Sequence, residues 1–311
     1  MSVHSFCSVI IPTIGRPSLD VAVNSVIGQT IASSHVEIIV VNDSGEPLPD
    51  TDWQQSKQVQ ILNTNKHERS VARNIGAAVS KGKYLCFLDD DDWLLPDALK
   101  CFWELAQSTE AAWLYGGTQL IDRQENPLIQ LHHGLNGNCF IQVLAGEWIP
   151  LQASLIRADA FFDVGGFNPL LTGPEDIDLL RRITLRYDLA ELQSVVASLK
   201  MGREGSTTDY DNHPERSRWA REMILASTGV FKRMRASATS SFWHGRIVRA
   251  YLTSVFWNVQ HRRLFTAVSR TGHTFYATIL AGLHFFSSRF WQAVLKPYRS
   301  QTFARGLREK R

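Results

Sequence analysis

The stretch that most constrains the fold of this chain is residues 83–99, which reads KYLCFLDDDDWLLPDAL. Its apolar residues 84–88 run directly into four consecutive acids at positions 89–92. A short apolar run without polar alternation is typical of a strand buried on both faces, as in a parallel sheet. Ligands of open α/β sheets bind beyond the carboxyl ends of the strands. The stretch therefore predicts a buried strand that leads directly into a ligand site.

The four acids favour a divalent metal as part of that ligand. Adjacent carboxylates repel one another unless a cation offsets their charge, and Mg²⁺ or Mn²⁺ prefers oxygen ligands that substrate phosphates often complete. A simpler role is open to one or two of them, because acids stabilise the first turn of a helix and Pro96 with Asp97 is typical of a helix start. Capping does not need four acids, so the metal site is favoured.

The charge of the chain is divided unevenly. At 311 residues, 44% of them hydrophobic, it is long enough for one large domain or two. Residues 1–229 hold 18 Lys and Arg against 29 Asp and Glu, whereas residues 230–311 hold 15 against 1. An acidic body with a basic tail indicates two tasks, and the tail favours an anionic partner.

The cysteines and the N-terminus indicate the cytoplasm. The four cysteines form no CxxC pair, and Cys7 and Cys86 fall in predicted buried strands, which is typical of a reducing compartment. The first residues lack the basic region and the long apolar run of a signal peptide.

Strand and helix patterns alternate through the first hundred residues. Strands are predicted at residues 6–11, 36–41, 59–62 and 84–88, and helices at 18–30 and 70–80. This alternation implies right-handed βαβ units and a parallel sheet. The chain has neither a GxGxxG after the first strand nor a GxxxxGK[ST], so a nicotinamide cofactor and a P-loop are not supported.

A second acidic group follows at Glu175, Asp176 and Asp178. Shorter strands are expected before it, at residues 112–115, 118–122 and 154–157, with a tight glycine loop at 165–168. Gly173 and Pro174 introduce a helix, which places Asp176 in its first turn. Considered alone, these acids fit a helix start stabilised by the dipole slightly better than a functional site.

Five motifs, in this order and spacing, are similar to those of a known family. They are VIIPTIGRPSL at 9–19, VVNDSG at 40–45, ERSVARNIGAAVSKGKYLCFLDDDD at 68–92, VGGFN at 164–168 and GPEDIDLLRR at 173–182. Together they resemble the inverting family 2 glycosyltransferases of the GT-A fold. The resemblance implies an α/β fold with a Rossmann-like, mixed but mostly parallel sheet flanked by helices, here with a C-terminal helical extension.

The resemblance covers residues 8 to about 208, and the uneven charge, with a change to helical patterns after about residue 230, indicates the domain limits. A catalytic domain would span residues 1–229, with a nucleotide-binding half to about residue 110 and an acceptor half from about 111. Residues 230–311 would form a basic, amphipathic helical tail.

The resemblance also assigns a donor side. Pro12, Thr13 and Asp43 would cradle the base and ribose of a nucleotide-sugar, and Arg73 would face the nucleotide. The DxD signature maps best onto residues 89–91. Asp89 and Asp90 would then contact the donor nucleotide.

Asp91 would be the direct metal ligand in that register. Because the run has four acids, a register over residues 90–92 stays open. His213 is a further candidate ligand, with a solvated loop histidine as the plainer interpretation. The implied cofactor is Mn²⁺ or Mg²⁺.

Asp176 matches the family's catalytic base. An inverting transfer needs one carboxylate to deprotonate the acceptor hydroxyl, while the metal neutralises the leaving nucleoside diphosphate in place of a second acid. Glu175, Gly166 and Phe167 would lie on the acceptor side. The Gln-x-x-Arg-Trp motif of processive members does not follow Asp176, which favours transfer of a single sugar.

The resemblance thus implies an inverting, metal-dependent transfer from a nucleotide-sugar, with a UDP-sugar favoured, in cell-surface glycan or glycolipid synthesis. The acceptor would be a hydroxyl, with a lipid-linked acceptor among the options. Two alternatives stay open: a Mg²⁺-dependent nucleotidyltransferase, which would release pyrophosphate, and a non-catalytic membrane-bound scaffold on the same fold.

The tail predicts helices with apolar faces and positive rims. Such helices fit an interfacial anchor on an anionic membrane surface, and so a peripheral place on the cytoplasmic face of the plasma membrane. The alternative is a helical subdomain that packs on the body or on a second subunit. No nucleic-acid partner is expected, because no recognition motif is present. Two faces are predicted, one of Ile247, Val248, Tyr251, Leu252, Val255, Phe256 and Val259 and one of Ile279, Leu283, Phe286, Phe290 and Val294.

Overall fold

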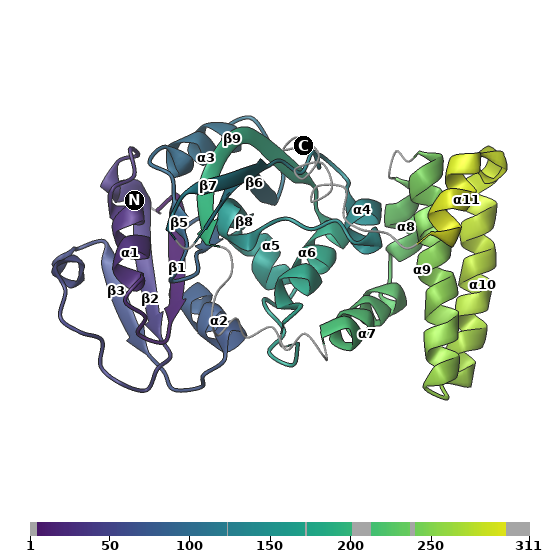
Figure 1. Ribbon diagram of the computed structural model, residues 1–311, viewed down its shortest axis with the longest axis horizontal. Coiled ribbons are helices and arrows are strands. Elements are labelled where there is room, and N and C mark those ends of the chain that lie inside the picture. The colour runs from purple at the N-terminus through teal and green to yellow at the C-terminus, as the bar shows by residue number, and fades with distance from the viewer. Residues whose placement is uncertain (1–4, 123, 172, 201–212, 237–239, 297–311) are drawn as a thin grey trace.

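The computed structural model describes residues 5–122, 124–171, 173–200, 213–236 and 240–296, with side chains from residue 215 onward in the fourth range. Over these ranges the chain forms a nine-stranded sheet flanked by helices, followed by a group of helices at the end of the molecule opposite β3 (Figure 1). The α/β class, the mixed but mostly parallel sheet flanked by helices and the C-terminal helical extension are as predicted.

The first half of the sheet is parallel. Its order is β3 (Val59–Asn63), β2 (Val36–Asn42), β1 (Cys7–Thr13) and β4 (Tyr84–Phe87), and each neighbouring pair runs in the same direction. Helix α1 (Leu19–Ile27) follows β1, and α2 (Arg69–Val79) precedes β4. The strands and helices predicted in the first hundred residues are confirmed, with the buried strand before the four acids among them.

The second half of the sheet is mixed. Beyond β4 come β8 (Ser154–Arg157), β6 (Trp113–Ile121), β9 (Leu189–Lys200) and β5 (Trp93–Leu94), while β7 (Pro127–Leu131) pairs with β6. The prediction of separate strands at 112–115 and 118–122 is wrong, because β6 runs through Gly116 and Gly117 with shifts in its register against β9. A Cβ on Gly116 would lie 2.7 Å from Val196, so the glycine admits β9 rather than forming a turn.

Both faces of the sheet are covered, which explains why its strands lack polar alternation. One face packs against α1 and α3 (Ala98–Ala106) through residues such as Val9 and Val40. The other packs against α2, α5 (Ala158–Asp163) and α6 (Glu175–Arg186) through residues such as Ile10 and Phe87. Successive residues of a strand point to opposite faces, so each strand is apolar throughout.

The C-terminal helices pack on the body. These are α7 (His213–Ala226), α8 (Val230–Arg235), α9 (Ser241–Gln260), α10 (Leu264–Ala281) and α11 (Ser288–Leu295). A third hydrophobic cluster joins Phe140 and Leu144 of α4 (Phe140–Ala145) to Tyr251 and Phe290. The alternative of a helical subdomain packed on the body is therefore what the structure shows, and contact with a membrane stays a prediction.

The two predicted apolar faces are only partly buried. In the first, Ile247, Val248 and Tyr251 are buried, whereas Phe256 and Val259 are exposed. The second is wrong as a single face, because α10 ends at Ala281 and a 3₁₀ turn, Gly282–Phe286, separates it from α11. Its members Ile279, Leu283 and Phe286 are exposed, while Phe290 and Val294 are buried. Within the described ranges, no helix is both long and apolar enough to span a membrane.

Candidate active site

Three loops meet at the carboxyl edge of the parallel strands. Because β2, β1 and β4 run in the same direction, Asp43, Thr13 and the four acids each follow or end a strand at the same edge. This is the edge at which α/β sheets bind ligands. The site predicted from the sequence is thus assembled by the topology of the sheet.

The four acids divide into a group of three and one that faces elsewhere. Asp89, Asp91 and Asp92 each offer a carboxylate oxygen, and these atoms lie within 4.8 Å of one another. Asp90 is buried and accepts hydrogen bonds of 2.6 Å from Thr13 Oγ1 and of 2.6 Å from an Arg16 guanidinium nitrogen. Three hard anionic oxygens at this spacing fit a divalent cation. We call Asp89, Asp91 and Asp92 the acidic triad. The choice between the DxD registers over residues 89–91 and 90–92 stays a prediction.

Arg73 links the acidic triad to the second acidic group. Its side chain is 3% exposed and donates to Asp89 Oδ1 at 2.7 Å and to Glu175 Oε1 at 3.2 Å. Burial opposes its charge, but the carboxylates of Asp89 and Glu175 outweigh this and raise the pKa of Arg73. Arg69, one turn earlier in α2, also reaches Glu175 Oε1 at 3.3 Å. One buried guanidinium therefore fixes the two acidic groups next to each other.

Asp176 lies in the first turn of α6, as predicted. Burial and the neighbouring charge of Glu175 raise the pKa of Asp176 to about 6, against the opposing effects of the Ile177 backbone N–H and of Arg73. A carboxylate with such a pKa is ionised at neutral pH and accepts a proton more readily than an exposed aspartate does. Glu175 is buried, and its Oε2 accepts a hydrogen bond of 2.9 Å from the Gly173 N–H.

Asn74, on α2, forms hydrogen bonds to the glycine loop at residues 165–168. Its side-chain amide donates to the Phe167 carbonyl at 2.9 Å and accepts from the Phe167 N–H at 2.9 Å. A Cβ on Gly166, whose φ is +67°, would lie 2.8 Å from Asn74 Oδ1, so this position requires glycine. The Phe167 ring is buried, with the Arg73 guanidinium 5.3 Å from its centroid. The structure thus places Phe167 as a support for Arg73, and an acceptor role for Gly166 and Phe167 stays a prediction.

The remaining predicted site residues are Asp43, Pro12 and His213. The Asp43 carboxylate accepts hydrogen bonds from the N–H groups of Lys66 and Glu68, at 2.6 and 2.7 Å, and so closes the loop before α2. Pro12 lies in β1, paired with Val41. The side chain of His213, at the start of α7, lies outside the described residues. Nucleotide or metal binding by these residues stays a prediction.

Three residues at the site were missed by the sequence reasoning. Gln152 donates to Asp89 Oδ2 at 2.6 Å, and no local pattern around it indicates a site. Arg16 and Arg69 lie inside the TIGRPS and ERSVAR segments, so their motifs marked them, but their acidic partners could be identified only from the fold.

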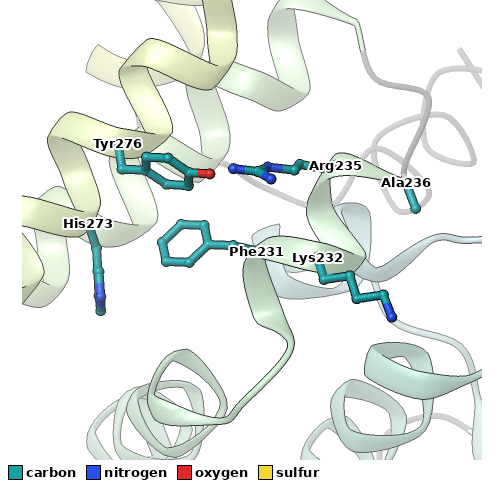
Figure 2. Close-up of a pocket in the computed structure, with 6 residues that line it drawn as sticks. All are labelled: Phe231, Lys232, Arg235, Ala236, His273 and Tyr276. Atoms are coloured by element: carbon teal, nitrogen blue, oxygen red, sulfur yellow. The ribbon is translucent and has the colours of Figure 1, made fainter.

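A cavity separate from the acidic triad lies among the C-terminal helices. It has a volume of about 680 Å³ and lies between α8 and α10 (Figure 2). The Arg235 guanidinium lies 5.3 Å from the centroid of the Tyr276 ring, and Figure 2 shows it beside the Tyr276 hydroxyl. None of the lining residues is acidic, so this cavity offers no carboxylate base. They are Phe231, Lys232, Arg235, Ala236, His273 and Tyr276.

A family model described as glycosyl transferase family 2 matches residues 8–166, about half of the chain, which include Arg73 and the acidic triad. The chain belongs to glycosyl transferase family 2. Among curated relatives, it is 25% identical over 206 residues to an uncharacterised glycosyltransferase of Rickettsia bellii, across 64% of this chain and 29% of that protein. It is 32% identical over 115 residues to the poly(ribitol-phosphate) beta-N-acetylglucosaminyltransferase TarP of Staphylococcus aureus, across 35% of each chain. This family 2 chain thus spans about a third of the length of each of these two relatives.

The fold of this chain resembles that of solved structures of GT-A glycosyltransferases. The crystal structure of S. aureus TarS 1–349 in complex with UDP-GlcNAc superposes with a TM-score of 0.58 over 85% of this chain and 89% of that one. The two chains are 16% identical, so this likeness concerns the fold. The resemblance inferred from the five motifs is confirmed by the family model and by this fold.

Proposed function

We propose that this family 2 member transfers one sugar from a nucleotide-sugar to a hydroxyl acceptor, with inversion at the anomeric carbon. The observation that carries the proposal is the Arg73 bridge, because it holds a candidate base beside a candidate diphosphate site. The TarS structure contains UDP-GlcNAc, and TarP is named as an N-acetylglucosaminyltransferase. UDP-GlcNAc is therefore the first donor to test.

In the proposed reaction, Asp176 removes the proton of the acceptor hydroxyl as its oxygen attacks the anomeric carbon. The new C–O bond forms as the bond to the donor diphosphate breaks, and the proton passes from Asp176 to solvent. Arg73 and Glu175 position the start of α6 relative to the acidic triad. Asp89, Asp91 and Asp92 would hold Mn²⁺ or Mg²⁺, which when bound neutralises charge on the leaving diphosphate.

The test is to incubate the protein with a panel of nucleotide-sugars and either metal, and to identify the products. Release of free nucleoside diphosphate supports glycosyl transfer, and release of pyrophosphate would point to a nucleotidyltransferase instead. Asp176→Asn should lower the rate by about 10²- to 10⁴-fold, the usual contribution of a general base, while donor binding persists. Asp159→Asn, at an exposed position on α5, is the control and should leave the rate unchanged.

Retained transfer in Asp176→Asn would reject this base. A chain that bound none of the nucleotide-sugars with either metal would instead fit the scaffold alternative.

We also propose that the enzyme works at the cytoplasmic face of the membrane, in cell-surface glycan or glycolipid synthesis. One side of α10 exposes Phe265, Val268, Phe275 and Ile279, with 96% of Phe265 accessible. Exposed Arg262 precedes this helix, in a tail that is strongly basic overall. Apolar side chains beside cations favour an anionic bilayer surface.

Sedimentation with vesicles tests this location. Phosphatidylglycerol vesicles should bind the protein more strongly than phosphatidylcholine vesicles, and added salt should weaken the binding. Phe265→Ser should reduce it, whereas Leu170→Ser, at a site on the body that is 82% exposed, should not. Equal binding to both vesicles, or none, would argue against the anchor.

A further inference from the structure

Three arginines gather where α7 packs on α6. Arg181 comes from α6, and Arg218 and Arg221 come from α7. An Arg181 guanidinium nitrogen lies 3.4 Å from the carbonyl oxygen of Ser217, at the turn of α7 that carries Arg218 and Arg221. We call these three residues the arginine cluster.

No member of the arginine cluster forms a salt bridge with an acid among the residues that the structure describes. Nε of Arg181, Nη1 of Arg218 and Nε of Arg221 are buried without a hydrogen-bond partner. Arg181 as a whole is 4% exposed. The two glutamates of α7 are engaged elsewhere, Glu215 with Trp257 and Glu222 with Ser254.

The electrostatics of the cluster are unfavourable in the unliganded protein. Burial lowers the pKa of Arg181 to about 10, against the opposing charges of Asp178 and Asp176. Burial, and then the charges of Arg218 and Arg181, lower the pKa of Arg221 to about 9. A buried charge without a partner destabilises a fold, and like charges add to the penalty. A ligand of opposite charge would remove both effects.

We propose that the arginine cluster binds a phosphate group of the acceptor, an inference that rests on the proposed glycosyl transfer. Arg181 lies five residues after Asp176 on the same helix, about 7.5 Å along its axis at 1.5 Å per residue. Five residues also turn the helix so that the two side chains leave it about 140° apart. The charge of Asp176 nevertheless acts on Arg181 and opposes the fall of its pKa, so the two side chains lie near each other. An acceptor held at Arg181 by its phosphate can therefore present a nearby hydroxyl to Asp176. One guanidinium group can donate two parallel hydrogen bonds to the oxygens of a phosphate. The charge of three arginines is balanced better by a phosphate group than by a singly charged carboxylate.

The test measures unfolding midpoints with and without inorganic phosphate, in EDTA so that no metal bridges phosphate to the acidic triad. Phosphate should raise the midpoint of the wild-type chain, because a ligand of the folded state stabilises it. Arg181→Gln and Arg221→Gln should each raise the midpoint without phosphate and weaken phosphate binding by about tenfold, as expected for a lost charge-assisted hydrogen bond. Arg186→Gln is the matched control, since this exposed α6 arginine pairs with Asp163 and should leave phosphate binding unchanged.

Variants that lower the midpoint and keep the phosphate response would overturn the inference, because they would show that the cluster only supports the fold. Displacement of phosphate by soluble glycerol phosphate would assign a soluble acceptor, and displacement by phosphatidic acid vesicles a lipid-linked one; either supports the cluster. Absence of a phosphate response in a chain that turns over nucleotide-sugars would overturn this inference alone. Phosphate binding without any such turnover would overturn the proposed function, and with it the assignment of the phosphate to an acceptor.

Discussion

Two buried charge networks in this molecule differ in how their charges are matched. In the body, Arg73 lies between carboxylates of two separate motifs, Asp89 and Glu175, and Asp176 follows directly. In the second network, which lies in the helical region, the acid is Glu222. Its Oε2 accepts from Ser254 at 2.6 Å, from Asn258 at 3.1 Å and from Arg270 at 3.4 Å.

The two networks differ in the balance of charge. The body network brings several carboxylates together, whereas the helical network surrounds one carboxylate with hydrogen-bond donors. Burial and the neighbouring charge of Glu175 raise the pKa of Asp176, and the acidic triad forms a place where a cation would be stabilised. Glu222 instead joins α7, α9 and α10, which is what helix packing needs. We therefore expect substitutions in the body network to change activity, and substitutions in the Glu222 network to change only stability.

Arg73→Met should have the largest effect. It leaves Asp89 and Glu175 buried without their cation, and breaking a buried ion pair costs about 3–5 kcal/mol. The free energy of unfolding should fall by that amount, and transfer should be lost because α6 is no longer fixed to the acidic triad. Arg73→Lys keeps the charge but not the two-armed contact, so its loss of stability should be smaller. Wild-type stability in Arg73→Met, measured by urea denaturation, would contradict this account of the bridge.

Asp91→Asn should act on the metal. Removing one carboxylate from the acidic triad should weaken Mn²⁺-dependent donor binding by at least about tenfold, as measured by calorimetry at a fixed Mn²⁺ concentration. Asp90→Asn is the internal comparison, because Asp90 bonds Thr13 and Arg16 instead. It should lower stability more than metal affinity. If Asp90→Asn lost the metal and Asp91→Asn kept it, the register over residues 90–92 would be correct.

The pH dependence of transfer should follow the ionisation of Asp176 in the body network. With its pKa at about 6, Asp176 is protonated below that pH and cannot accept a proton. The ratio kcat/KM should therefore be flat at neutral pH and fall about tenfold for each pH unit below 6. Glu175→Gln removes a neighbouring negative charge, so the inflection should move to lower pH. An inflection that stays in place in this variant would show that Glu175 does not act on the base.

Much of this body could be predicted from local sequence patterns. The apolar run before the four acids specifies a buried strand, and the helix start at Gly173 and Pro174 places Asp176 in a first turn. These features depend on neighbouring residues alone. Gly116 shows where local patterns fail, because a glycine that suggests a turn in fact admits β9 alongside β6.

The contacts that make the site were not predictable in the same way. Arg73 and Glu175 are separated by 102 positions, and Gln152 reaches Asp89 from a segment without any recognisable motif. The arginine cluster likewise exists only because α7 packs on α6. Such pairings depend on tertiary packing, which is not encoded in the spacing of any one segment.

Ser254→Ala should have the smallest effect of these active-site and network substitutions, and it tests the Glu222 network. It removes one of three donors to Glu222 Oε2, so the free energy of unfolding should fall by about 1 kcal/mol. Ser227→Ala, which removes only a bond from an exposed hydroxyl to the Met223 carbonyl, should cost less. Neither change should alter kcat or the donor KM, because Glu222 belongs to the helix packing. A loss of transfer in Ser254→Ala at unchanged stability would mean that the Glu222 network communicates with the active site, and the separation of the two networks would be wrong.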